Sequence, residues 1–373
     1  MEQCNMKKLC ENIDEICRSD FERKKGFGAA YAVCLDGAPL ERCYGVSAPE
    51  SGEPISNRTL FRLASMSKPV TAVAALTLVE DGLLSLDDGI DKYLPVFKEI
   101  KIIDLNGNTS VPKRLPTVRD LLTHTAGIGS IGEKIAKMTA ADRESLDSAI
   151  AFYIRDGLDF APGEAQIYSG TGAFDVLTKI IELVTRKDYL TFLRERVLIP
   201  CEMVDTTFIP SEEQWGRMVA MHQRVDGENA TDKMHPGCVF ETVPMTHFLG
   251  GAGLVSTLHD YSNFAEMLLG EGTFRGKVIL KKDTFRLLST PQVSESIMPG
   301  TERWGLGVRV IVDDAYPYLP RGAFGWSGAY GSHFWIDPVH KLYAVFLKNS
   351  RVDGGAANES ARMFEKAVYT ALL

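Results

Sequence analysis

The stretch TLFRLASMSKPVTAVAALTLVEDG, residues 59–82, decides the fold of this chain. Its first seven residues have the pattern of a short strand, which leads directly into Ser65. From Ser65 onward the pattern is helical and apolar nearly all round its later turns, and it stops at Gly82. A helix that is apolar on every side is normally buried between layers. We therefore predict a strand, a serine at the junction and a buried central helix.

Strand patterns lie at both ends of the chain, with helical patterns between them. Residues 26–46 read as two strands joined by a hairpin turn at Asp36-Gly37. Further strand patterns occupy residues 304–312, 322–337 and 341–349, and amphipathic helices are predicted at about 5–24 and at 357–373. The intervening helical patterns occupy residues 87–95, 117–128, 145–154, 172–185 and 188–200. This order predicts a discontinuous α/β lobe, residues 1–84 and 300–373, interrupted by a mostly helical lobe, residues 85–299.

The composition excludes several classes of partner. The net charge is −8 with a pI near 5.5, and the chain has no basic stripe, so a nucleic acid or an anionic membrane is not expected to bind. No apolar run is long enough to span a bilayer, and the N-terminus has no signal-like apolar region, so a cytoplasmic protein is expected. The seven cysteines are odd in number and lack C-x-x-C spacing, which predicts reduced thiols and no metal site.

Ser65 and Lys68 are the candidates for nucleophilic chemistry. They lie three residues apart, so on a helix they share one face. A serine needs a neighbouring base, and a lysine buried against this helix could accept a proton near neutrality. The alternative is that Ser65 is only a helix cap and that Lys68 is solvated. A second copy of the spacing, Ser110-Val-Pro-Lys113, is predicted to be a loop because of its proline and the preceding Asn-Gly-Asn.

Three segments together resemble the motifs of serine β-lactamase-related proteins. They are SMSK (65–68), PGEAQIYSG (162–170) and FGWSGAYGSHFWIDP (324–338). Within that superfamily the chain resembles class C β-lactamases and, more closely, family VIII carboxylesterases. The resemblance covers nearly the whole chain from about residue 20. It implies an α+β fold: a β-lactamase/transpeptidase-like α/β/α sandwich with an antiparallel sheet, a mostly helical second lobe, and an active site in the groove between them.

The second motif of the family is Tyr-x-Asn, and the resemblance places it at Tyr168-Ser169-Gly170. The phenol of Tyr168 would relay the proton from the nucleophile to the leaving group. Tyr261-Ser262-Asn263 matches the letters better, but it lies in a helical pattern, so we choose Tyr168. Tyr168 could otherwise be a core tyrosine.

The third motif falls at Trp326-Ser327-Gly328, on a strand that we expect at a sheet edge. The resemblance implies that the N–H groups of Ser65 and Ala329 form the oxyanion hole and that Gly328 permits close approach of the substrate. Alternatively, Trp326 merely packs in a glycine-rich strand. Among the other late aromatics, which mostly suit strand packing, Tyr330 is the candidate for a pocket wall. His124, in LLTHTAG, is expected to fix a nearby loop and not to be catalytic.

Two departures from the family pattern decide the expected activity. In β-lactamases the asparagine of the second motif and the cation of the third hold the antibiotic, and neither Gly170 nor Trp326 can do this. We expect Trp326, Ser327, Gly328, Gly170 and Tyr330 to contact the substrate. The expected reaction is hydrolysis of small esters through a covalent acyl-enzyme, without cofactor or metal. The rivals are a β-lactamase or D-amino-acid peptidase, an acyltransferase to a small-molecule acceptor, and a non-catalytic sensor that stays acylated. The oligomeric state is left open.

Overall fold

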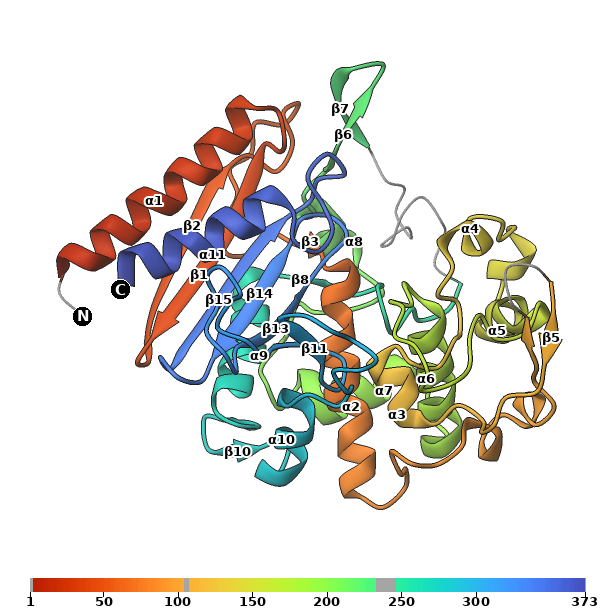
Figure 1. Ribbon diagram of the computed structural model, residues 1–373. Coiled ribbons are helices and arrows are strands. Elements are labelled where there is room, and N and C mark those ends of the chain that lie inside the picture. The colour runs from red at the N-terminus through yellow and green to blue at the C-terminus, as the bar shows by residue number, and fades with distance from the viewer. Residues whose placement is uncertain (1–2, 104–106, 233–245, 373) are drawn as a thin grey trace.

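The computed structural model describes residues 3–103, 107–232 and 246–372 (Figure 1). The helices are α1 (Gln3–Glu22), α2 (Ser67–Glu80), α3 (Val118–Thr123), α4 (Gly132–Ile135), α5 (Leu146–Arg155), α6 (Gly172–Thr185), α7 (Tyr189–Leu193), α8 (Glu212–Gly216), α9 (Leu258–Leu269), α10 (Lys282–Ser289) and α11 (Glu359–Leu372). The main-sheet strands are β1 (Gly28–Leu35), β2 (Ala38–Gly45), β11 (Glu302–Trp304), β12 (Arg309–Ile311), β13 (Phe324–Ser327), β14 (His333–Asp337) and β15 (Leu342–Lys348). The short strands are β3 (Phe61–Arg62), β4 (Ile102–Ile103), β5 (Thr109–Ser110), β6 (Met221–Val225), β7 (Glu228–Asp232), β8 (Val255–Ser256), β9 (Thr273–Phe274) and β10 (Lys277–Val278).

Strands from the two ends of the chain form one antiparallel sheet of seven strands, in the order β11-β12-β13-β14-β15-β1-β2. The N-terminal hairpin joins the C-terminal strands through the β1–β15 pair, in which Tyr31 lies opposite Phe346. The predicted turn at Asp36-Gly37 is confirmed: both residues have positive φ, 48° and 78°, as the tightest hairpin turn requires.

Apart from the edge strand β2, the sheet is buried on both faces, and alternate residues of one strand enter different cores. In β15 the side chains of Tyr343, Val345 and Leu347 pack in one core, while Leu342, Ala344 and Phe346 pack in the other. The second core is closed by α1 and α11, which lie side by side in Figure 1. The first is closed by α9, which packs on β15, β14 and β1. The predicted α+β sandwich with an antiparallel sheet is therefore confirmed.

Three further helices pack against α2, the central helix predicted from residues 65–82. Helix α2 contacts α6, α7 and α10, and residues 67–78 are all buried. Helix α2, in the range 1–84, thus contacts helices of the range 85–299, and α9, in the range 85–299, packs on the sheet. The division of the chain into lobes at those bounds stays a prediction.

Two local expectations are wrong. Residues 87–95 do not form an α-helix: Gly89 has an extended conformation, and two separate 3-10 turns, Ile90–Lys92 and Pro95–Phe97, follow. Strand β13 is not an edge strand, since β12 and β14 flank it. However, β12 pairs only with Phe324 and Gly325, so the end of β13 that carries Trp326 and Ser327 extends past its neighbour on that side.

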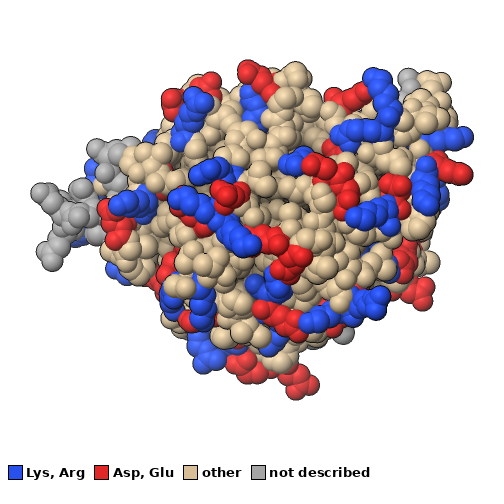
Figure 2. All heavy atoms as spheres, turned by 90° about the horizontal axis from the view of Figure 1, so that it is seen from below, with Lys and Arg blue, Asp and Glu red and all other residues tan. Residues whose placement is uncertain are grey.

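The surface carries charges of both signs. On the face shown in Figure 2, Lys and Arg side chains are interspersed with Asp and Glu, and neither sign forms a large continuous patch. In the described ranges, no helix is both long enough and apolar enough to cross a membrane.

Candidate active site

Ser65 lies between β3 and α2, as the sequence predicts. Strand β3 pairs with β8 and ends at Arg62, and Ser65 occupies a single 3-10 turn, Ala64–Met66, directly before α2. Ala64 adopts a left-handed conformation, φ 46°, which is uncommon for a residue with a side chain and typical of strained functional turns. The cap position of α2 is Met66, so the alternative that Ser65 is the cap of this helix is wrong.

Lys68 is fully buried, which excludes the alternative of a solvated lysine. Its Nζ lies 3.4 Å from the Ser65 Oγ, 2.6 Å from the carbonyl oxygen of Gly170 and 3.0 Å from that of Gly251. Two main-chain acceptors therefore hold the amine, and the third contact points it at the serine. The rings of Tyr168 and Phe174 lie 4.9 and 5.3 Å from the same nitrogen.

Tyr168 completes the cluster. Its hydroxyl donates to the Ser65 Oγ at 2.7 Å and accepts a hydrogen bond from the Trp326 indole Nε1 at 3.2 Å. The structure thus brings Ser65, Lys68, Tyr168 and Trp326 together from three separate segments, because Ser65 and Lys68 share one. The other candidate, Tyr261, is fully buried in α9 and donates to the carbonyl of Met66 at 2.9 Å, so it stabilises the start of α2 from outside the cluster.

The second serine–lysine spacing does not form a site. Ser110 lies in the exposed two-residue strand β5, and Lys113 forms an exposed ion pair with Glu164 at 2.9 Å.

His124 holds the loop of Tyr168 on both sides, as expected for a loop-fixing residue. Its carbonyl accepts a hydrogen bond from the Ile167 N–H at 3.2 Å, and its Nδ1 accepts one from the Ser169 N–H at 3.2 Å. Burial, with a smaller effect of the Lys68 charge, holds the pKa of His124 well below its usual 6.5. Neutral His124 with an accepting Nδ1 carries its proton on Nε2. Its ring lies 4.6 Å from that of Tyr168.

Trp326 packs with Trp304 and Tyr168, and we call these three rings the aromatic wall. The sequence predicted only part of this group. Trp304 stacks on Tyr168 with 5.9 Å between ring centres, and its ring lies 4.6 Å from that of Trp326. Trp304 is one of the late aromatics that the sequence analysis assigned to strand packing, and its position 22 residues before Trp326 gave no sign that the two rings meet. Gly251 was missed because it acts through its carbonyl oxygen, which any residue type carries.

Three predicted substrate contacts have other roles in the structure. The Ser327 side chain points to the opposite face of the sheet, where its hydroxyl bonds the buried His333 Nδ1 at 2.8 Å, and the His333 Nε2 bonds Glu365 at 3.1 Å. Tyr330 is buried against Ala64 and Met221. A side chain on Gly328 would place its Cβ 2.4 Å from the Leu63 carbonyl oxygen, so this glycine admits the backbone beside Ser65.

Gly170 and Ala329 remain open to solvent. A Cβ added to Gly170 would have no described atom within 4 Å, so the missing second-motif side chain leaves space unfilled. Ala329 is exposed between the buried residues Gly328 and Tyr330. In the described part of the chain no three His, Cys, Asp or Glu side chains gather to hold a metal ion.

The sequence profile of the family described as Beta-lactamase matches residues 13–367. The chain belongs to the beta-lactamase family. Esterase EstB of Burkholderia gladioli is 28% identical over 375 residues, covering 93% of this chain and 92% of that protein. The uncharacterized protein MT1414 of Mycobacterium tuberculosis is 32% identical over 325 residues, 80% of this chain and 79% of that protein. Among solved structures, EstCE1, "a hydrolase with promiscuous acyltransferase activity", aligns with TM-score 0.80 at 22% identity over 97% of this chain and 99% of that one. As a member of the beta-lactamase family, the chain is a serine hydrolase of the β-lactamase/transpeptidase type.

Proposed function

We propose that the protein is a carboxylesterase that hydrolyses small neutral esters through an acyl-enzyme on Ser65. The observation that carries the proposal is the 2.7 Å hydrogen bond between Tyr168 and the Ser65 Oγ, with the buried Lys68 amine on the same oxygen. A serine hydroxyl that touches two groups able to exchange a proton is equipped for nucleophilic attack.

In the first step, the Ser65 Oγ forms a bond to the ester carbonyl carbon while its proton passes to the Lys68–Tyr168 pair, which must hold a free base for this step. The carbonyl oxygen gains negative charge, which the N–H groups of Ser65 and Ala329 stabilise. The carbon–alkoxide bond then breaks, and Tyr168 donates the proton to the departing alcohol. In the second step, water repeats the attack on the acyl carbon, and Ser65 regains its proton.

The neutral aromatic wall favours an ester over a charged amide substrate. Trp326 stands where penicillin-recognising relatives carry a cation, and its indole N–H is committed to Tyr168. Gly170 has no amide side chain to bind a peptide-like group. These features leave apolar surface from the half-buried Trp326, with the buried Trp304 packed against it, beside the reacting atoms, which suits a neutral acyl or alcohol group. The esterase activity named for the EstB relative agrees with this choice.

Hydrolysis of p-nitrophenyl butyrate tests the proposal. We expect Ser65→Ala to lose activity by several orders of magnitude, because the nucleophile is removed. The matched control is Ser110→Ala, which removes an exposed hydroxyl with the same local spacing and should retain wild-type activity. Equal rates for wild type and Ser65→Ala would reject the assignment.

The rival reactions would pass through the same acyl-enzyme, and three further measurements distinguish them. Faster turnover of nitrocefin than of the ester would indicate a β-lactamase. New ester products with added alcohol would indicate transfer to an acceptor other than water. A permanent mass increase after one turnover would indicate an acylated sensor.

A further inference from the structure

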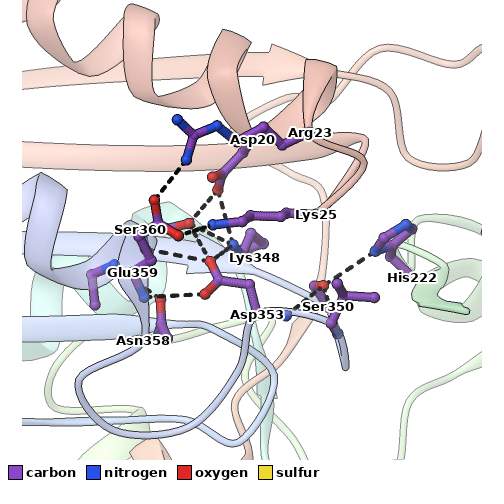
Figure 3. A network of polar contacts seen from close by, with 12 residues as sticks. Asp20, Arg23, Lys25, His222, Lys348, Ser350, Asp353, Asn358, Glu359 and Ser360 are labelled. Atoms are coloured by element: carbon purple, nitrogen blue, oxygen red, sulfur yellow. Dashed lines mark hydrogen bonds and ion pairs between the residues drawn. The ribbon is translucent and has the colours of Figure 1, made fainter.

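A buried lysine, paired with two carboxylates, lies next to residues 328–332, the turn that follows β13. Lys348, the last residue of β15, is almost fully buried, and its Nζ donates to the carboxylates of Asp20 at 2.9 Å and Asp353 at 2.7 Å and to the Ser360 hydroxyl at 2.8 Å (Figure 3). These three contacts use all the N–H donors of an ammonium group. The partners come from α1, from the loop after β15 and from α11, so one cation joins three segments.

Asp353 is held more tightly than Asp20. Its Oδ1 accepts a hydrogen bond from the Glu359 N–H at 3.1 Å, and its Oδ2 accepts one from the Ser360 N–H at 3.3 Å, at the start of α11. Burial alone would raise the pKa of this carboxyl, but the Lys348 charge and the Ser360 hydroxyl outweigh burial and lower it. The carboxylate therefore fixes the loop that carries it, residues 350–355, against α11 and β15.

This loop supports the turn of residues 328–332 through the main chain. The Ser350 N–H donates to the Tyr330 carbonyl at 2.8 Å, and the Gly355 N–H donates to the Gly328 carbonyl at 3.3 Å. A Cβ on Gly354 would lie 2.1 Å from the Ala329 carbonyl oxygen, and one on Gly331 would lie 2.6 Å from that of Asp353. No side chain separates the two backbones at these points, so a displacement of the loop displaces the turn.

The opposite side of the turn contacts the backbone that leads to Ser65. Gly328 approaches the Leu63 carbonyl so closely that a Cβ there would lie 2.4 Å from it, and Leu63 is two residues before the nucleophile. The turn is thus packed between the segment of Ser65 and the loop of Asp353. Ala329 is its exposed residue.

We propose that Asp353 is a positioning residue for the Ala329 N–H, the second donor of the oxyanion hole. The inference rests on the proposed function, because the oxyanion hole matters only if Ser65 forms an acyl-enzyme. Asp353 acts through its loop: the carboxylate fixes residues 350–355, and these fix the turn that presents the N–H.

The test compares Asp353→Asn with Asp20→Asn. Both substitutions remove one negative charge from the same buried ammonium, but only Asp353 belongs to the supporting loop. We expect Asp353→Asn to lower kcat for p-nitrophenyl butyrate by about 10- to 100-fold with little change in KM, since small misplacements of a catalytic donor have effects of this size. Asp20→Asn should stay within about 3-fold of wild type in kcat, with a comparable fall in melting temperature.

Gly354→Ala provides a second route to the same contact without changing any charge. The new methyl group must displace the Ala329 carbonyl, so this variant should reproduce the loss in kcat at nearly constant KM. If Asp353→Asn does not fold, Gly354→Ala alone tests the proposal. Equal kcat values for the two Asp→Asn variants, or wild-type kcat in Gly354→Ala, would overturn the proposal. Failure of the proposed function has a different signature, because Ser65→Ala would then remain active.

Discussion

His124 shows how far the candidate site depends on one buried side chain. It adopts a left-handed conformation, φ 59°, and holds the residues on both sides of Tyr168. Asparagine tolerates this backbone conformation and carries an acceptor oxygen, whereas leucine does neither. We therefore predict that His124→Asn keeps most of the esterase activity. His124→Leu should lose at least about 10-fold in kcat and have a lower melting temperature, because the Ser169 N–H is left without its acceptor. Kinetics and thermal melting of both variants check this, and equal activity in the two would contradict it.

Among the helices and strands, local sequence pattern predicted those segments whose structure is set by residues close to them in the chain. The hairpin at Asp36-Gly37, the central helix α2 and the position of Ser65 at its start could be predicted because turn chemistry and apolar periodicity act within a few residues. The family resemblance chose Tyr168 over Tyr261, and the structure places only Tyr168 against Ser65.

Features set by long-range pairing could not be predicted in this way. Period-2 alternation predicts that Trp326 and Ser327 face opposite sides of β13, but not which side holds the site. Both were expected to contact the substrate, whereas the Ser327 hydroxyl bonds His333. The strand was placed at an edge because nothing in its residues shows that β12 pairs with its first half. The Trp304–Trp326 contact and the carbonyl of Gly251 depend on tertiary packing alone.

For the molecule as a whole, buried imidazoles determine how stability varies with pH. Burial lowers the pKa of His124, His222, His247 and His333 from 6.5, so the unfolded chain binds protons below this pH that the folded chain does not. Stability should then fall as the pH drops below about 6.5. Asp175 acts in the opposite sense because burial raises its pKa to about 7, and burial also raises the pKa of Glu182 and Asp260, but these three carboxyls are fewer than the four imidazoles. We predict a lower urea midpoint at pH 5.5 than at pH 7.5; a higher midpoint at pH 5.5 would contradict the assignment of neutral buried histidines.

The identity of the reactive serine is most directly measured by labelling the protein with a fluorophosphonate and mapping the adduct by peptide mass spectrometry. The arrangement of Lys68 and Tyr168 around the Ser65 Oγ predicts one adduct per chain, on Ser65, and none in Ser65→Ala. An adduct on any other serine, or labelling that persists in Ser65→Ala, would contradict the account.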